Sequence, residues 1–277
     1  MAKQLGGVYY VHDQHWVDGE AAMTADLKKA KAYGFNFALL SCWQEHQDKI
    51  ALAFNAAMAA NLKLGILLES TTLPVKLRAQ FAHQLLDKYG SHPKIFKYRG
   101  KPLVLVYSPA WTGTVPLWEA ELPSLKSKAT MVCDNVRPEW VVAFDGCYNY
   151  NIDTLVKGEQ NATFYANLKG IYQQITTKAN AAGKFFIPTL MAKFDDSAFR
   201  NPSIVLNEQE GSLLWGCWEA LRGLECDLAI VTSLNELAEN SNVLHNSKYL
   251  NMVKQIKTFW LNYGELWVNP LNQTMPS

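Results

Sequence analysis

Short apolar or β-branched runs alternate along the chain with longer segments whose apolar residues recur every three or four positions. The short runs predict strands at Val8–His12, Phe35–Ser41, Leu62–Glu69, Pro102–Tyr107, Thr130–Asn135, Ala143–Asn149, Phe185–Met191 and Leu228–Asn235. The longer segments predict helices at Ala21–Tyr33, Asp48–Asn61, Val75–Tyr89, Thr163–Ala182, Gly211–Leu224 and Lys248–Tyr263. Gly34 follows the first helix and is expected to end it in the left-handed conformation.

This alternation indicates parallel strands joined by crossover helices. Because eight strands are the number that closes a barrel, the predicted fold class is α/β, a (β/α)₈ TIM barrel, with residues 1–277 forming a single domain. An open doubly wound sheet is the main alternative, but the segment Tyr9–His12 cannot serve as its Gly-rich turn.

One unit of the predicted barrel is unusually short. Only Val136–Val142 separate the fifth and sixth predicted strands, whereas a parallel crossover usually needs about a dozen residues. Either a single helical turn lies near Pro138–Trp140, or the strand boundaries differ from those given above.

Composition and charge narrow the classes of partner. The chain is 49% apolar and 18% charged, which allows a sizeable core and excludes a disordered protein. A net charge of +1 without a basic stripe argues against nucleic acid or a membrane surface and fits a neutral ligand. No apolar run reaches the roughly 18 residues of a membrane span, and Met1–Gly7 lacks a signal-peptide core. A soluble protein of unknown compartment is therefore expected.

Several reactive residue types have simple structural explanations. The five cysteines include no CxxC pair and are expected to be buried free thiols. His12, His15 and His46 lack a third ligand at metal-binding spacing, so neither a metal nor a cofactor is expected. Three further features are expected to be structural: Lys193 as a surface lysine, Trp215 and Trp218 as packing residues, and Asp195–Asp196 as a solvated loop.

Aromatic, amide and carboxylate side chains gather where the predicted strands end, which is where barrel enzymes place their active sites. Prominent among them are Tyr10, Trp43, Glu69, Tyr107, Tyr148 and Asn235. Aromatic faces pack on sugar C–H groups, while amides and carboxylates pair with hydroxyls. This composition suits a neutral, polyhydroxylated ligand.

The last predicted strand runs directly into two carboxylates, Glu236 and Glu239. If the chain becomes helical after Asn235, both lie on one helix face within reach of each other. Two close carboxylates have their pKa values pushed apart, which supplies the acid and the base that glycoside cleavage needs. In the alternative interpretation, Ser233 or Asn235 caps the last helix and the glutamates favour its positive end.

Several stretches of the chain resemble glycoside hydrolase family 99, the endo-α-mannosidases, and related barrel proteins. Thr232–Glu239 has the spacing of the family's Thr-Ser/Thr-x-Asn-Glu-x-x-Glu segment in strand eight. The other similar stretches are Val8–Tyr10, Leu67–Glu69, His92–Tyr107 and Asp145–Tyr150, so the resemblance spans residues 8 to about 240. Leu237 and Asn240–Ser241 depart from the family's pattern, which leaves the sugar specificity open.

This resemblance implies a metal-independent, retaining glycosidase that acts within α-linked oligosaccharides or polysaccharides through a 1,2-anhydro sugar. Glu239 would be the general acid/base and Glu236 the base that assists the 2-hydroxyl. The residues implied to shape the sugar-binding cleft are Tyr10, Trp43, Glu69, Tyr107, Tyr148 and Asn235. The alternatives are a carbohydrate-binding barrel without turnover, a glycosidase of different linkage specificity, and a lyase or aldolase that uses a metal or a lysine. The oligomeric state is not predicted.

Overall fold

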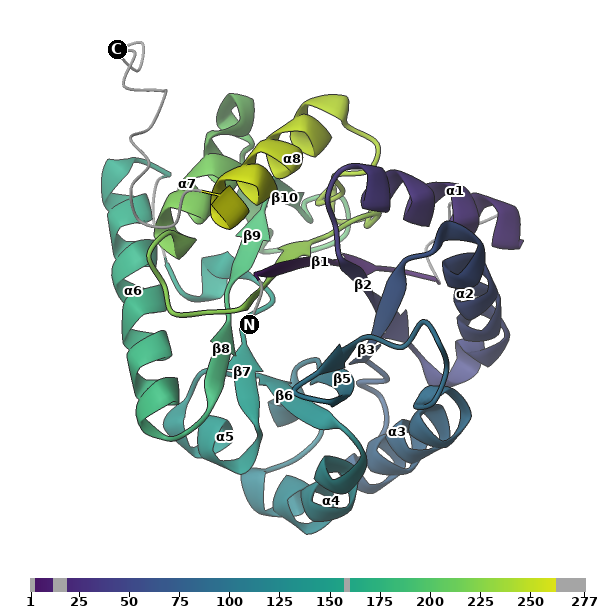
Figure 1. Cartoon of the computed structure of the whole chain (residues 1–277). Coiled ribbons are helices and arrows are strands. Elements are labelled where there is room, and N and C mark those ends of the chain that lie inside the picture. The colour runs from purple at the N-terminus through teal and green to yellow at the C-terminus, as the bar shows by residue number, and fades with distance from the viewer. Residues whose placement is uncertain (1–2, 12–18, 157–159, 263–277) are drawn as a thin grey trace.

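The computed structural model describes residues 3–11, 19–156 and 160–262. Nine parallel segments form the central ring: β1 (Gln4–Tyr9), β2 (Phe37–Cys42), β3 (Lys63–Leu68), β5 (Lys101–Val106), β6 (Thr130–Asp134), β7 (Gly146–Tyr148), β8 (Phe185–Ile187), β9 (Thr189–Met191) and β12 (Leu228–Thr232). Only Pro188 separates β8 from β9, so these two segments are halves of one strand; β7 pairs with β8, and β12 pairs with β9. Because β12 also pairs with β1, eight strands close the ring and the predicted (β/α)₈ barrel is confirmed (Figure 1).

Helices surround this ring (Figure 1). They are α1 (Gly19–Ala32), α2 (Gln47–Ala60), α3 (Val75–Tyr89), α4 (Val115–Lys128), α5 (Pro138–Ala143), α6 (Ala162–Ala181), α7 (Ser212–Leu221) and α8 (Ser247–Asn262). The six predicted helices are confirmed to within three residues at each end, whereas α4, which contains Pro123, was not predicted. Gly34 has a φ of 99°, as expected for the residue that stops α1. No helix in the described ranges has the length and apolar character needed to cross a membrane.

The first strand was predicted in the wrong place. It runs from Gln4 to Tyr9, whereas the apolar pattern indicated Val8–His12, and His12 lies outside the described residues. The cause is the pair of glycines within the strand. A Cβ atom on Gly6 would lie 2.3 Å from the ring of Phe37, so a larger residue does not fit there. Glycine is therefore part of the barrel wall at this point and does not mark a loop.

Apolar side chains fill two separate layers. One cluster lies inside the ring, where the rings of Phe37 and Phe96 stack 3.9 Å apart, and the other lies between the strands and the helices. All five cysteines are buried and free, as predicted. Trp218 is buried beside Trp260, and the half-buried Trp215 packs near Phe259, which confirms that these tryptophans are packing residues.

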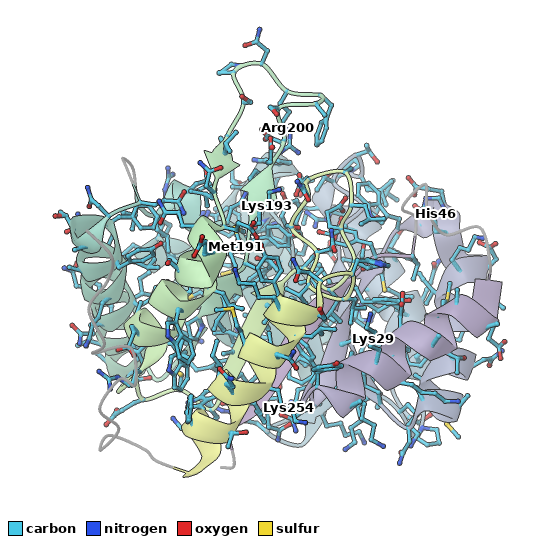
Figure 2. All side chains as sticks on the ribbon, turned by 90° about the horizontal axis from the view of Figure 1, so that it is seen from above. Lys29, His46, Met191, Lys193, Arg200 and Lys254 are labelled. Atoms are coloured by element: carbon cyan, nitrogen blue, oxygen red, sulfur yellow. The ribbon has the colours of Figure 1, made fainter. Side chains whose placement is uncertain are left out.

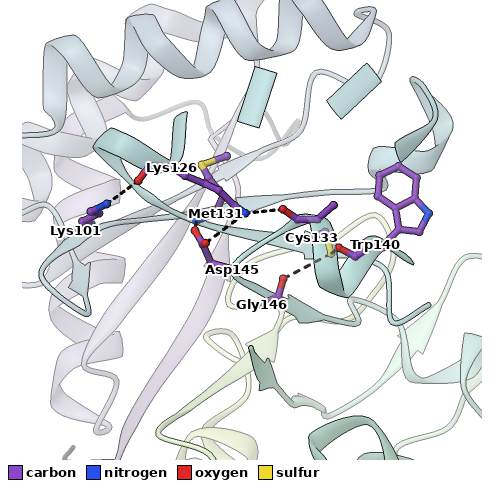
Figure 3. Close-up of polar contacts among 8 residues, drawn as sticks. Lys101, Lys126, Met131, Cys133, Trp140, Asp145 and Gly146 are labelled. Carbon is purple, nitrogen blue, oxygen red and sulfur yellow. Dashed lines mark hydrogen bonds and ion pairs between the residues drawn. The ribbon is translucent and has the colours of Figure 1, made fainter. Parts of the chain in front are cut away.

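The short unit between β6 and β7 contains a helix of six residues, α5, close to the single turn that was predicted. Ala143 belongs to this helix, so the predicted start of the sixth strand is wrong. Polar contacts hold the unit together (Figure 3). The Asp145 carboxylate accepts the N–H of Met131, and the Asp145 N–H donates to the Met131 carbonyl, both at 2.9 Å. The Cys133 thiol, in β6, donates to the carbonyl of Trp140 at 3.7 Å.

Three shorter strands complete the described structure. β4 (Lys97–Tyr98) pairs antiparallel with β5. β10 (Phe194–Asp195) and β11 (Val205–Leu206) form an antiparallel hairpin after β9. Figure 2 shows the loop of this hairpin, with Arg200, projecting beyond the strand end near Met191 and Lys193. The hairpin therefore stands at the end of the barrel where the strands finish.

Candidate active site

Three glutamates lie just after strands β3 and β12, at the carboxyl end of the barrel. Glu69 directly follows β3, while Glu236 and Glu239 lie in the segment after β12. The charges of Glu236 and Glu239 both act on the carboxyl group of Glu69. All three glutamates also act on the buried hydroxyl of Tyr10, which follows β1. Four of the predicted site residues are thus electrostatic neighbours at this end of the barrel, where Glu69, Glu236 and Glu239 form a glutamate cluster.

The two glutamates after β12 are not placed by a helix. Residues 237–240 form a turn, and the last helix begins further along the chain, so both the predicted helical spacing and the capping alternative are wrong. Instead, the hydroxyl of Ser233 accepts the N–H of Glu236 at 2.7 Å. The Glu236 carboxylate in turn accepts the N–H of Ala238 at 3.1 Å. These two bonds hold Glu236 in a compact loop at the barrel mouth.

Asn235 connects this loop to the first strand. Its side-chain oxygen accepts the N–H of Tyr10 at 2.8 Å, and its side-chain nitrogen donates to the Tyr10 carbonyl at 2.9 Å. Asn235 is only 1% exposed, so its amide is committed to the backbone of Tyr10. The hydroxyl of Tyr10 forms a hydrogen bond with the hydroxyl of Tyr150. That Asn235 shapes a sugar-binding cleft stays a prediction; its observed contacts position Tyr10.

Burial controls the ionisation of Glu69. Loss of hydration raises the pKa of this carboxyl group to about 8, and the charges of Glu236 and Glu239 add to the rise. Hydrogen bonds from Ser41 and Trp43 act in the opposite direction. Glu69 is therefore mostly protonated at neutral pH and is able to donate a hydrogen bond to a ligand oxygen.

Glu239 is paired with a residue that the sequence analysis missed. Arg200, in the loop between β10 and β11 (Figure 2), places Nη2 at 2.9 Å from Oε1 of Glu239 and Nη1 at 2.8 Å from Oδ2 of Asp196. Burial raises the pKa of Glu239, and the Arg200 guanidinium acts against this rise. Asp196 is fully buried, so the prediction that it lies in a solvated loop is wrong.

A cleft of about 530 Å³ lies beside the glutamates, at the ends of β5, β6 and β7. Its lining includes Tyr107, Trp111, Asp134, Asn149, Tyr150 and Arg200. Trp111 is 71% exposed, and its ring meets that of Tyr107 edge-on at 5.8 Å. Tyr150 and Arg200 line the cleft and also contact Tyr10 and Glu239, respectively, so the cleft and the glutamate cluster adjoin.

Asp134 organises the floor of this cleft. Its carboxylate accepts the N–H of Tyr150 at 2.9 Å and the N–H of Ser108 at 3.3 Å. Burial raises the pKa of Asp134 to about 6, while these hydrogen bonds lower it. The carboxylate thereby ties the ends of β5 and β7 together.

The remaining predicted residues occupy different positions. Tyr107 lines the cleft, and Trp43 is half-buried beside Glu69. Tyr148 is fully buried within the ring, and its hydroxyl has no hydrogen-bond partner among the described residues. Tyr150, two residues beyond Tyr148, reaches the cleft instead. Because side chains two positions apart along an extended segment point the same way, the sequence could have indicated Tyr150 together with Tyr148.

Histidine, cysteine and acidic side chains are spread over the part of the chain that the structure describes. No three His, Cys, Asp or Glu side chains there are grouped to hold an ion. His12 and His15 lie outside the described residues, and His46 ends a short 3₁₀ helix, η1 (Gln44–His46), on the right of the view in Figure 2. Lys193 is half-buried just past β9.

No protein-family model and no curated protein matches the chain. Solved structures do match it. A GH99 endo-α-mannosidase from Bacteroides thetaiotaomicron, in complex with bis-tris-propane, has a TM-score of 0.75 at 17% identity, covering 92% of this chain and 96% of that one. A second structure of a GH99 endo-α-mannosidase from the same organism gives 0.73 at 15% identity, with coverage of 91% and 96%. The predicted resemblance to the family-99 barrel is thus confirmed as a likeness of fold.

A GH5 protein from Streptomyces cattleya, in complex with Manβ1-4GlcNAc, is also similar in structure. Its TM-score is 0.66 at 10% identity, and the match covers 95% of this chain and 82% of that one. This chain therefore shares its (β/α)₈ barrel fold with the GH99 and GH5 structures.

Proposed function

We propose that the chain is a glycoside hydrolase that cleaves α-linked, mannoside-like glycans with retention of configuration. The observation that carries this proposal is a cleft lined by aromatic and amide side chains at the carboxyl ends of the strands, next to the electrostatically coupled Glu69, Glu236 and Glu239. The likeness in fold to GH99 and GH5 structures supports it. The substrate is an oligosaccharide or polysaccharide, and the bond that is cleaved lies inside the glycan, away from its ends.

The reaction has two steps. In the first, Glu236 takes the proton of the 2-hydroxyl while O2 attacks C1. Glu239 gives its proton to the glycosidic oxygen, and the C1–O bond to the leaving sugar breaks. In the second step, water attacks C1 of the 1,2-anhydro sugar and loses a proton to Glu239, while the C1–O2 bond breaks and O2 recovers its proton from Glu236. Two inversions at C1 give net retention.

Other groups of the site bind the sugar. A protonated Glu69 donates to a sugar oxygen, which an ionised carboxylate cannot do. The rings of Trp111 and Tyr107 offer apolar faces to sugar C–H groups at the cleft. No step uses a metal ion or a cofactor.

The test is hydrolysis of a panel of defined α-linked oligosaccharides, mannosides included, followed by ¹H NMR of the first-formed anomer. We expect the new reducing end to appear first in the α configuration, with a rate that a chelator does not change. Release of the β anomer would exclude the mechanism. Binding of a glycan without any hydrolysis would favour a carbohydrate-binding barrel instead.

A further inference from the structure

Arg200 lies where the hairpin, the cleft and the glutamate cluster meet. Its side chain is 47% exposed and lines the cleft, yet both terminal nitrogens are bound to carboxylates, those of Asp196 and Glu239. A main-chain hydrogen bond also joins the hairpin to Glu239, because the N–H of Asp195 donates to the carbonyl of Glu239 at 2.8 Å. The hairpin is therefore fastened to the turn that carries Glu239 by an ion pair and by a main-chain hydrogen bond.

Asp196 fixes the guanidinium of Arg200 in this position. One oxygen of the buried Asp196 carboxylate accepts the N–H of Ile204 at 2.7 Å, and the other accepts from Arg200. The N–H of Arg200 also donates to the Asp196 carbonyl at 3.0 Å. Because the loop already orients the guanidinium, holding Glu239 costs little additional side-chain entropy.

We infer that Arg200 is a positioning residue, which holds the Glu239 carboxyl group at the edge of the cleft. This inference rests on the proposed role of Glu239 as the acid/base. A group in that role must hold a proton before cleavage and accept one from water afterwards. Burial raises the pKa of Glu239, and the adjacent Arg200 guanidinium opposes this rise by favouring the ionised form.

The other charged and titratable groups that face Glu239 come from elements all around the barrel mouth. Asp196 and Asp153 raise its pKa, in opposition to Arg200. The further groups that interact with it are Glu69 after β3, Tyr10 after β1, Tyr107 after β5 and Tyr150 after β7. Arg200 is a cation that acts against these groups at Glu239.

The experiment measures the pKa of Glu239 by ¹³C NMR of the carboxyl group in the full chain, with assignment by Glu239→Gln. We expect Arg200→Met to raise this pKa by about one unit, since a partly exposed opposite charge gives the low end of the usual range. Arg200→Lys, which keeps the charge, should restore most of the parent value. The control is Arg222→Met, because Arg222, just past the end of α7, pairs with Glu219 at 2.9 Å and its loss should leave the pKa of Glu239 unchanged.

The pH–rate profile supplies the second readout. Its alkaline limb, where the acid loses its proton, should move upward by the same amount in Arg200→Met. Because this variant leaves the buried Asp196 unpaired, the pair Arg200→Met with Asp196→Asn is measured too, and a smaller rise is expected there. An unchanged Glu239 pKa in both variants would overturn the inference. If the parent hydrolyses no glycan, the proposed function fails, whereas the NMR titration still decides the role of Arg200.

Discussion

The side-chain amide of Asn235 forms two hydrogen bonds with the main chain of Tyr10, one to its N–H at 2.8 Å and one to its carbonyl at 2.9 Å. These bonds join the segment after the last strand to the residue after the first strand. Both partners are buried, so no solvent replaces either bond. The loop with Glu236 and the ring of Tyr10 are therefore held in one arrangement.

Asn235→Ala should lower the free energy of unfolding by about 2–4 kcal/mol, because it leaves a buried N–H and a buried carbonyl without partners. Urea denaturation measures the loss. Asn149→Ala is the matched control, since the Asn149 amide bonds to Thr154 at 3.0 Å in an exposed position. We expect that control to lose less than about 1 kcal/mol. Equal losses in the two variants would show that the bonds to Tyr10 contribute nothing special.

Glu239→Gln should reduce kcat on a natural α-linked glycan by roughly 10²–10⁴-fold, which is the usual contribution of a general acid. On a substrate with an activated leaving group, such as a glycosyl fluoride, the same variant should lose much less of its rate, since fluoride leaves without taking a proton. Glu236→Gln should slow both substrates alike. Comparison of the initial rates on the two substrates separates the two roles, and a parallel loss for Glu239→Gln would contradict the assignment. Glu119→Gln, at an exposed position on α4, is the control.

Glu69 should make the protein less stable as the pH rises. Its pKa is about 8 in the folded chain and 4.5 for an ordinary, solvated glutamate, so the folded state keeps a proton that the unfolded state releases. The free energy of unfolding should therefore fall by up to about 1.4 kcal/mol per pH unit between these values. In Glu69→Gln this contribution disappears, while Glu119→Gln keeps it. Denaturation at a series of pH values gives the slopes, and identical slopes in the parent and Glu69→Gln would disprove the shift.

Trp111→Ala should weaken glycan binding without a loss of stability. The ring is 71% exposed, so its removal exposes little buried area and should not change stability. A sugar packed on the ring would lose about 1.4 kcal/mol of binding free energy, which corresponds to roughly a tenfold rise in KM. The value of kcat should change little. Kinetics on oligosaccharides of increasing length checks this, with the exposed Val142→Ala on α5 as the control. An unchanged KM would place the sugar elsewhere in the cleft.

The barrel was predictable because its strand and helix periods persist in nearly every unit. The exceptions have local causes. Gly6 and Gly7 look like a loop in the sequence, yet they make room for the side chains of Phe37 and Leu234 in the wall. Pro188 lies inside the predicted seventh strand and divides it into β8 and β9, each with a different neighbour.

The site was predictable only in its residue types. Strand ends and the family-like segment pointed to Glu69, Glu236 and Glu239, and the charges of Glu236 and Glu239 act on Glu69 in the structure. The ionisation of Glu69 depends on tertiary burial, which no local pattern records. No local pattern indicated Arg200, which lies in a polar loop. Its partner Glu239 becomes a neighbour only when the hairpin packs on the loop after β12.

The burial of all five cysteines makes the chain suitable for site-specific labelling. Thiol reagents attack the thiolate, and burial raises the pKa of each of these thiols, to about 12 for Cys147, Cys217 and Cys226. A cysteine introduced by Phe199→Cys, at an exposed position beside Arg200, would then be the thiol that reacts first. A fluorophore or spin label attached there would report movements of the hairpin without removal of any native cysteine.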